Sequence, residues 1–77
     1  MIGHRVNRIE LEDYTENAGL TETQIQILRM KYFNSEERSV VSICMSLNIS
    51  VTKYSKENRS LWDSIDRYLA QKEVNNW

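Results

Sequence analysis

The sequence predicts an all-α protein, a small bundle of three to four helices. Its 77 residues include no proline and two glycines, so few positions are expected to interrupt a helix. Hydrophobic residues make up 40% of the chain, and clusters of turn residues are few. A chain of this length forms one domain with a small core, to which a second copy of the chain is one way of adding buried surface.

Residues 1–19 are expected to form either a short helix or an arm that becomes ordered only on a partner. The segment holds apolar residues at roughly helical spacing and then acidic ones, namely Ile2, Val6, Ile9, Glu10, Glu12, Asp13 and Glu16. Asn17 and Gly19 predict a loop after it. We expect His4 to be a solvated side chain, because no second site residue accompanies it.

The next helix is predicted to begin near Glu22. Thr21 and Gln24 have the spacing of a capping box, in which each side chain bonds to the backbone N–H of the other residue. Ile25, Leu28 and Tyr32 are expected on one face, with Ile27, Met30 and Phe33 at flanking positions. An apolar surface this wide predicts the central core element. A polar connector over residues 34–38 follows this helix.

Two further helices joined by a tight turn are predicted between residues 39 and 69. Ser39 is the expected N-cap of the first, whose apolar face comprises Val40, Ile43, Cys44 and Leu47. Asn48 tolerates the left-handed conformation that ends a helix, and Ser50 can cap the helix that follows. This pattern indicates a helix-turn-helix domain over residues 20–70. Cys44 lies on the apolar face and is expected to be a packed side chain, not a redox sensor.

The last helix is predicted to have a buried face and a polar face. The buried face comprises Tyr54, Asn58, Leu61, Trp62, Ile65, Tyr68 and Leu69. Because recognition helices contact base edges with their first turns, the predicted DNA-binding residues are Ser50, Thr52, Lys53, Ser55, Lys56, Arg59 and Ser60. The alternative is that the cations on this face serve only solubility. Asp63 and Asp66 are expected to face away from phosphate or to meet a protein.

Residues 71–77 form a polar tail that ends on a tryptophan. The tail is either a frayed end or an extension of the last helix that pairs with a second copy of the chain. In the second case the homodimer or partner contact is expected to use Tyr68, Leu69, Val74 and Trp77. A two-fold dimer of this kind would present two recognition helices to a two-fold DNA site.

Some fifty residues, from Leu20 to about Leu69, resemble the region 4-type domain of bacterial sigma factors and related small phage-borne regulators. The similar stretches are L-T-E-T-Q-I-Q-I-L-R-M-K-Y-F and S-V-V-S-I-C-M-S-L-N-I-S, and the LuxR-type output domain shares much of this outline. The chain departs from the family pattern at Cys44, Asn48 and Lys53. It has no counterpart of the sigma region that melts promoters, so the resemblance implies a regulator or an auxiliary factor.

Two functions from different classes follow. The first is a DNA-binding transcription regulator of phage or mobile-element type that contacts double-stranded DNA with the helix starting near Ser50. The second is a protein-binding module that contacts or inhibits RNA polymerase, a sigma factor or another host or phage protein. The net charge of −1 gives no general argument for nucleic acid, and residues 1–38 carry seven acidic against five basic side chains.

Other classes of protein are not expected. The sequence shows no Ser/His/Asp set, paired carboxylates, metal-ligand cluster or glycine-rich phosphate loop, so we expect no enzyme, metal or cofactor. The single cysteine excludes an internal disulfide. No apolar run reaches the roughly 18 residues of a membrane span, and the first residues lack the apolar stretch of a signal peptide, so a cytoplasmic location away from membranes is expected.

Overall fold

The computed structural model describes residues 5–33 and 38–75, and every regular element in these ranges is helical. The elements are α1 (Arg8–Asn17), α2 (Glu22–Ile27), the π-helical segment η1 (Leu28–Phe33), α3 (Val40–Leu47) and α4 (Val51–Asn75). Segment η1 continues α2 directly, so the described chain forms four helical rods and no strand. The all-α prediction is confirmed.

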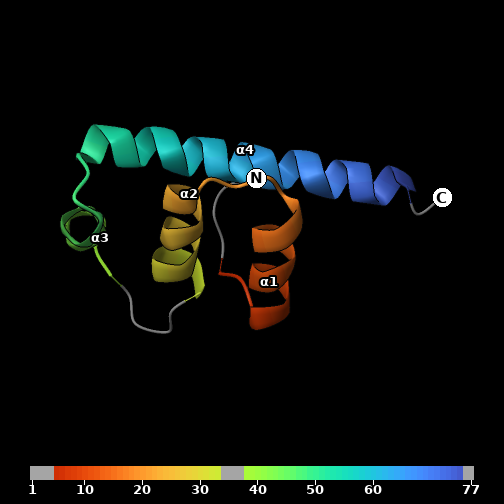
Figure 1. Ribbon diagram of the computed structural model, residues 1–77, viewed down its shortest axis with the longest axis horizontal. Coiled ribbons are helices and arrows are strands. Elements are labelled where there is room, and N and C mark those ends of the chain that lie inside the picture. The colour runs from red at the N-terminus through yellow and green to blue at the C-terminus, as the bar shows by residue number, and fades with distance from the viewer. Residues whose placement is uncertain (1–4, 34–37, 76–77) are drawn as a thin grey trace.

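Helix α4 runs along the whole molecule, and the shorter helices lie on one side of it (Figure 1). Its 25 residues span about 37 Å at the α-helical rise, and the longest dimension of the molecule is 43 Å. Along α4 from its N-terminal end, Figure 1 shows α3 first, then α2 with η1, and then α1. Helix α3 is seen nearly end-on, so its axis crosses that of α4 steeply.

Polar side chains cap the N-terminus of each α-helix. The capping box predicted for α2 is confirmed, with Thr21 Oγ1 accepting from the Gln24 N–H at 3.2 Å and Gln24 Oε1 accepting from the Thr21 N–H at 3.1 Å. Ser39 Oγ accepts from the Ser42 N–H at 3.1 Å, as expected for α3. Ser50 Oγ accepts from the Lys53 N–H at 3.0 Å, which confirms it as the cap of α4.

The turn between α3 and α4 has the predicted left-handed residue. Asn48 has φ 56° and ψ 48°, and among the described non-glycine residues it alone has a positive φ. The Ile49 N–H donates to the Cys44 carbonyl at 3.0 Å and thereby closes the C-terminus of α3. The chain thus turns steeply from α3 into α4 within the three residues 48–50.

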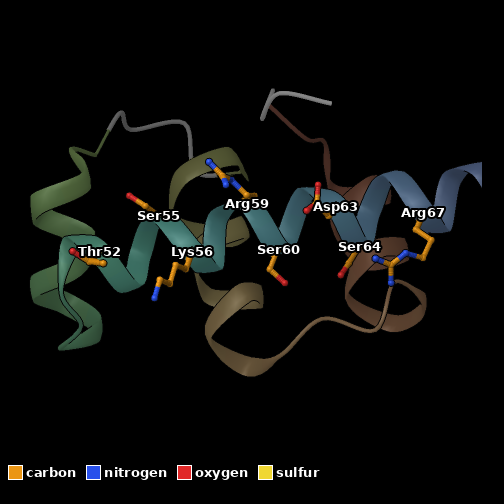
Figure 2. A pocket seen from close by; sticks show the side chains of 8 residues that line it. All are labelled: Thr52, Ser55, Lys56, Arg59, Ser60, Asp63, Ser64 and Arg67. Carbon is orange, nitrogen blue, oxygen red and sulfur yellow. The ribbon is translucent and has the colours of Figure 1, made fainter.

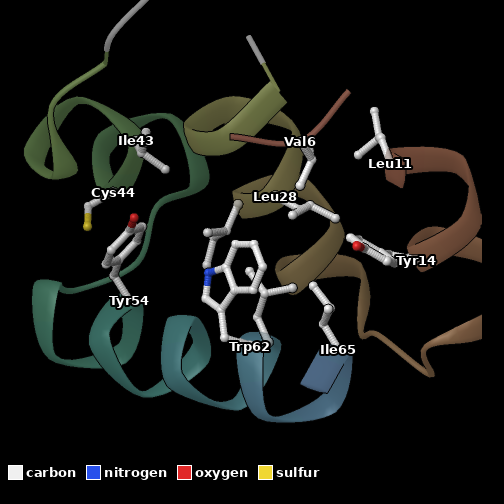
Figure 3. Packing of buried hydrophobic residues seen from close by; sticks show 11 residues of the cluster. Val6, Leu11, Tyr14, Leu28, Ile43, Cys44, Tyr54, Trp62 and Ile65 are labelled. Carbon is white, nitrogen blue, oxygen red and sulfur yellow. The ribbon is translucent and has the colours of Figure 1, made fainter. Parts of the chain in front are cut away.

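A single apolar core joins all the helices. The side chains with no exposed surface are Ile27, Leu28, Ile43, Leu61 and Ile65. The face predicted for α4 is confirmed, since Tyr54, Leu61, Trp62 and Ile65 are buried and Asn58, Tyr68 and Leu69 are half-buried. Figure 3 shows the Trp62 indole in the middle of this core. The Tyr32 ring packs edge-on against the Trp62 indole, with 4.9 Å between the ring centroids.

The first helix is packed differently from the sequence pattern. Ile9 is 78% exposed, whereas Leu11 and Tyr14 are the residues that α1 buries. The cause is a capping box between Asn7 and Glu10, which starts the helix at Arg8 and turns Ile9 outward. Ile2 and His4 lie outside the described residues.

The buried face of the second helix also differs from the expectation. Ile27, predicted at a flanking position, is fully buried beside Leu28, while Ile25 and Tyr32 are half-buried. The π-helical geometry of η1, whose i→i+5 bonds place more residues in each turn than the 3.6 assumed for the pattern, applies to Tyr32, whereas Ile25 and Ile27 precede it in α2. The predicted apolar face therefore changes direction at Leu28.

Candidate nucleic-acid interface

The seven residues predicted to bind DNA lie together on the outer side of α4. All of them are exposed, and they occupy the N-cap and the first three turns of the helix; they are Ser50, Thr52, Lys53, Ser55, Lys56, Arg59 and Ser60. The buried face of α4 holds the opposite side of the helix against the core, and this packing directs the seven side chains away from the protein.

Two rows of side chains run along this surface (Figure 2). Residues four apart are neighbours on a helix, and this spacing places Ser55, Arg59 and Asp63 in one row and Thr52, Lys56, Ser60 and Ser64 in the other. Cations and hydroxyl groups thus alternate over the first three turns. This combination of groups donates hydrogen bonds to phosphate and to base edges.

The acidic residue within these turns is directed away from the outer surface. Glu57 is half-buried, and its Oε2 accepts a hydrogen bond from the Thr21 hydroxyl at 3.5 Å, at the start of α2. Lys53, Lys56 and Arg59 therefore share the outer side of the first three turns without an acidic side chain among them. The local charge is positive even though the whole chain carries a net charge of −1.

The helix backbone adds to this positive charge. The N-terminal N–H groups of a long α-helix carry a partial positive charge of roughly half an elementary charge, which favours anions. The first turn of α4 contains no acidic residue that would neutralise it. Its Lys53 side chain is exposed at the same end.

This surface is an open helix face and not a cavity. The depression along it is lined by Thr52, Ser55, Lys56, Arg59, Ser60, Asp63, Ser64 and Arg67, which all belong to α4 (Figure 2). No second element supplies an opposite wall, so a small molecule would gain little burial there. A convex helix face instead fits a partner that is itself grooved. The major groove of DNA, which is about 12 Å wide, admits an α-helix.

The outer face changes character at Asp63. This residue is exposed and lies twelve positions after Val51, about 18 Å along the helix. Its carboxylate follows Arg59 in the same row, and it would repel phosphate. The surface suited to nucleic acid therefore ends after about three turns of α4.

The residues predicted to contact a second copy are not gathered in one exposed patch. Tyr68 and Leu69 are half-buried and pack against the core of their own chain, and the Tyr68 hydroxyl donates to Asp13 on α1. Val74 is 69% exposed at the other end of α4 from the residues predicted to bind DNA. Trp77 lies outside the described residues.

Val51 is an exposed residue of this surface that the sequence pattern did not select. It is the first residue of α4, and 52% of its surface is exposed although it is apolar. Hydropathy assigns a valine to the core. The signal that identifies it is its place directly after the N-cap Ser50, in the first turn of α4.

Other kinds of site find little support in the described residues. Residues 5–33 and 38–75 contain no group of three or more His, Cys, Asp or Glu side chains arranged to hold a metal ion. Over the same ranges, no helix combines the length and the apolar character needed to cross a membrane. Cys44 is a buried free thiol, with its Sγ 3.8 Å from the Ser50 carbonyl oxygen.

Comparison of the chain with models of protein families, with curated proteins and with solved structures found no significant match.

Proposed function

We propose that α3 and α4 form a DNA-binding helix-turn-helix and that the protein is a transcription regulator that binds double-stranded DNA in a sequence-specific manner. The observation that carries the proposal is the outer face of α4, where hydroxyl and cationic side chains occupy three consecutive turns. The resemblance of residues 20–69 to sigma region 4-type domains supports it and points to a regulator of phage or mobile-element type.

In the proposed complex the first three turns of α4 enter the major groove. Thr52 and Ser55 then lie nearest the base edges or the sugar-phosphate backbone, and Lys56 and Arg59 reach phosphates or guanine. Lys53 is a further phosphate contact. The remaining four turns of α4 extend out of the groove, since the helix spans about 37 Å and the groove is about 12 Å wide.

The rest of the molecule fits this orientation. Glu12 and Glu16 are exposed on α1, which lies at a distance from the N-terminal end of α4 (Figure 1). DNA bound at that end therefore meets the cations of α4 and not the acidic residues of α1. The acidic residues of α1 therefore do not oppose binding in this arrangement.

The proposal is tested by binding of the full chain to random-sequence duplex DNA across a salt series. The variant K53E/K56E/R59E removes the three cations of the surface, and R5E/R8E/R29E is its control, because it changes the net charge equally at exposed positions outside α4. We expect sequence-selective binding that weakens with salt, a log-log slope of about −0.9 per phosphate contact, and loss of binding in the first variant alone. Absence of binding at low salt, or equal loss in both variants, would contradict the proposal.

A protein-binding module is the second candidate, and one observation favours it. Val41 and Met45 are 60% and 78% exposed and lie four residues apart on α3, so they form adjacent apolar side chains on the surface. Their partner would be RNA polymerase, a sigma factor or another host or phage protein. The variant V41S/M45S is expected to lose capture of polymerase subunits and to retain DNA binding; unchanged capture would dismiss this role for α3.

A further inference from the structure

We infer that Val51 recognises the 5-methyl group of thymine in the major groove. This inference rests on the proposed DNA-binding function and specifies one element of the sequence that α4 prefers. It starts from an apolar side chain that the structure leaves open to solvent at the end of α4 assigned to the groove.

Val51 is unusual among the apolar residues of its helix. Large apolar side chains of α4 are exposed at two described positions, Val51 at 52% and Val74 at 69%, which lie at opposite ends. The other apolar side chains of the first three turns, such as Tyr54 and Leu61, belong to the core. Val51 is therefore the apolar contact that the first turn can offer to a partner.

The neighbours of Val51 are hydroxyl groups and cations. Ser50 and Thr52 flank it in sequence, and Ser55 follows it four residues later on the same edge of the helix. The segment from Ser50 to Tyr54 contains no arginine, asparagine or glutamine, and Lys53, which could also bond to guanine, is assigned above to a phosphate. The first turn is thus poorly equipped to distinguish purines by hydrogen bonds.

The amide in the following turn is already engaged within the protein. Asn58 Oδ1 accepts a hydrogen bond of 2.6 Å from the Tyr32 hydroxyl, and Asn58 is half-buried. It is therefore directed towards η1 and not towards DNA. Asn58 is thus not placed to recognise adenine, and apolar contact by Val51 adds discrimination near the start of the helix.

Thymine is the base that such a contact selects. In the major groove each base pair presents its own pattern of groups, and the apolar group among them is the thymine 5-methyl. Burial of a methyl group against an exposed valine removes apolar surface from water on both sides. We expect a gain in affinity of roughly three- to fivefold for each methyl group so buried.

The test replaces thymidine by deoxyuridine, which pairs in the same way and lacks the methyl group. Duplexes are selected from a random-sequence pool with the wild-type chain, and each thymidine of a selected duplex is then replaced singly. Binding is measured for the wild type, for V51A and for V74A. The second variant is the control, because it shortens an exposed valine of the same helix far from the proposed contact.

We expect at least one position at which deoxyuridine weakens wild-type binding roughly three- to fivefold. V51A should bind the thymidine duplex more weakly by a similar factor and respond little to the replacement, while V74A should respond as the wild type does. If the wild type binds selectively but no position responds, or if V51A keeps the full response, the inference about Val51 is wrong and the proposed function stands. Absence of selective binding by the wild type would overturn both.

Discussion

The Tyr68 hydroxyl donates a hydrogen bond of 2.6 Å to Oδ1 of Asp13, a residue 55 positions earlier in the chain. Lys72 Nζ lies 3.2 Å from the other carboxylate oxygen, and the Tyr14 ring packs edge-on against Tyr68 with 6.4 Å between the centroids. These contacts attach α1 to the C-terminal half of α4. The end of α4 that we assign to DNA is left free of α1.

This attachment predicts a specific loss of stability in acid. The hydrogen bond from Tyr68, and then the bond and charge of Lys72, lower the pKa of Asp13 below its ordinary value of 3.8. A carboxyl with a lowered folded-state pKa stabilises the fold above its unfolded-state value, and this contribution disappears as the pH falls through the folded-state value. D13N should therefore be less stable than the wild type near neutral pH, and the two should converge as the pH falls below the folded-state pKa of Asp13.

Urea unfolding of both proteins at several pH values measures this difference. The control is E12Q, which removes the neighbouring carboxylate at an exposed position of α1 and leaves the bond to Tyr68 in place. Parallel stability profiles for D13N and the wild type down to the acid limit would show that the charge of the Asp13 carboxylate contributes nothing to folding.

The contact between Asp13 and Tyr68 illustrates which features of the fold are visible in the sequence. The cap at Ser50, the left-handed Asn48 and the buried face of α4 depend on residues within a few positions of one another, and these predictions were correct. The bond across 55 positions depends on how α1 meets α4 and has no sequence pattern. The π-helical turn at η1 likewise has no sequence pattern. The apolar face predicted with 3.6 residues per turn therefore does not apply to residues 28–33.

The candidate site was predictable to a similar extent. Periodicity alone placed Lys56 and Arg59 on the outer face, because the apolar side of α4 is well marked. It did not identify the exposure of Val51, because this apolar residue belonged neither to the predicted buried face nor to the predicted polar contacts. It also could not show that Tyr68 is occupied by α1, because that depends on the tertiary arrangement.

The raised pKa of Tyr54 should make the protein less stable at alkaline pH. Burial, followed by the neighbouring Tyr32, raises the pKa of Tyr54 from 10.0 to about 12. The unfolded chain then loses this proton at a lower pH than the folded chain, so stability falls as the pH rises above 10 towards the folded-state value. Y54F removes this ionisation and should reduce the slope of stability against pH in that range.

The measurement is urea unfolding at about pH 9 and pH 11, with phenolate absorbance recorded in parallel. Some slope should remain in Y54F, because the pKa values of Tyr14 and Tyr68 are raised as well. If Y54F has the same slope of stability against pH as the wild type, the ionisation of Tyr54 does not contribute to the loss of stability in alkali.

The core predicts a large difference between two truncations within α4. Leu61 has no exposed surface, so L61A leaves a cavity among Ile27, Leu28 and their neighbours and should cost about 2–5 kcal/mol of the unfolding free energy. V74A, at a position 69% exposed, should change it by less than about 0.5 kcal/mol. Chemical denaturation followed by circular dichroism gives both values. Similar losses of unfolding free energy in L61A and V74A would show that Leu61 is not a core residue.

The conformation of Asn48 gives a third pair of variants, which separates backbone strain from side-chain contacts. At φ 56° an alanine carries the steric cost of a Cβ in the left-handed region, roughly 1–2 kcal/mol, whereas glycine adopts the same conformation freely. N48A should therefore lower the unfolding free energy by about 1 kcal/mol, and N48G should equal or exceed the wild type. Both variants remove the Asn side chain, so equal losses would assign its role to side-chain contacts. A loss confined to N48A would show that the left-handed backbone conformation, and not the Asn side chain, sets the stability of the turn that joins α3 to α4.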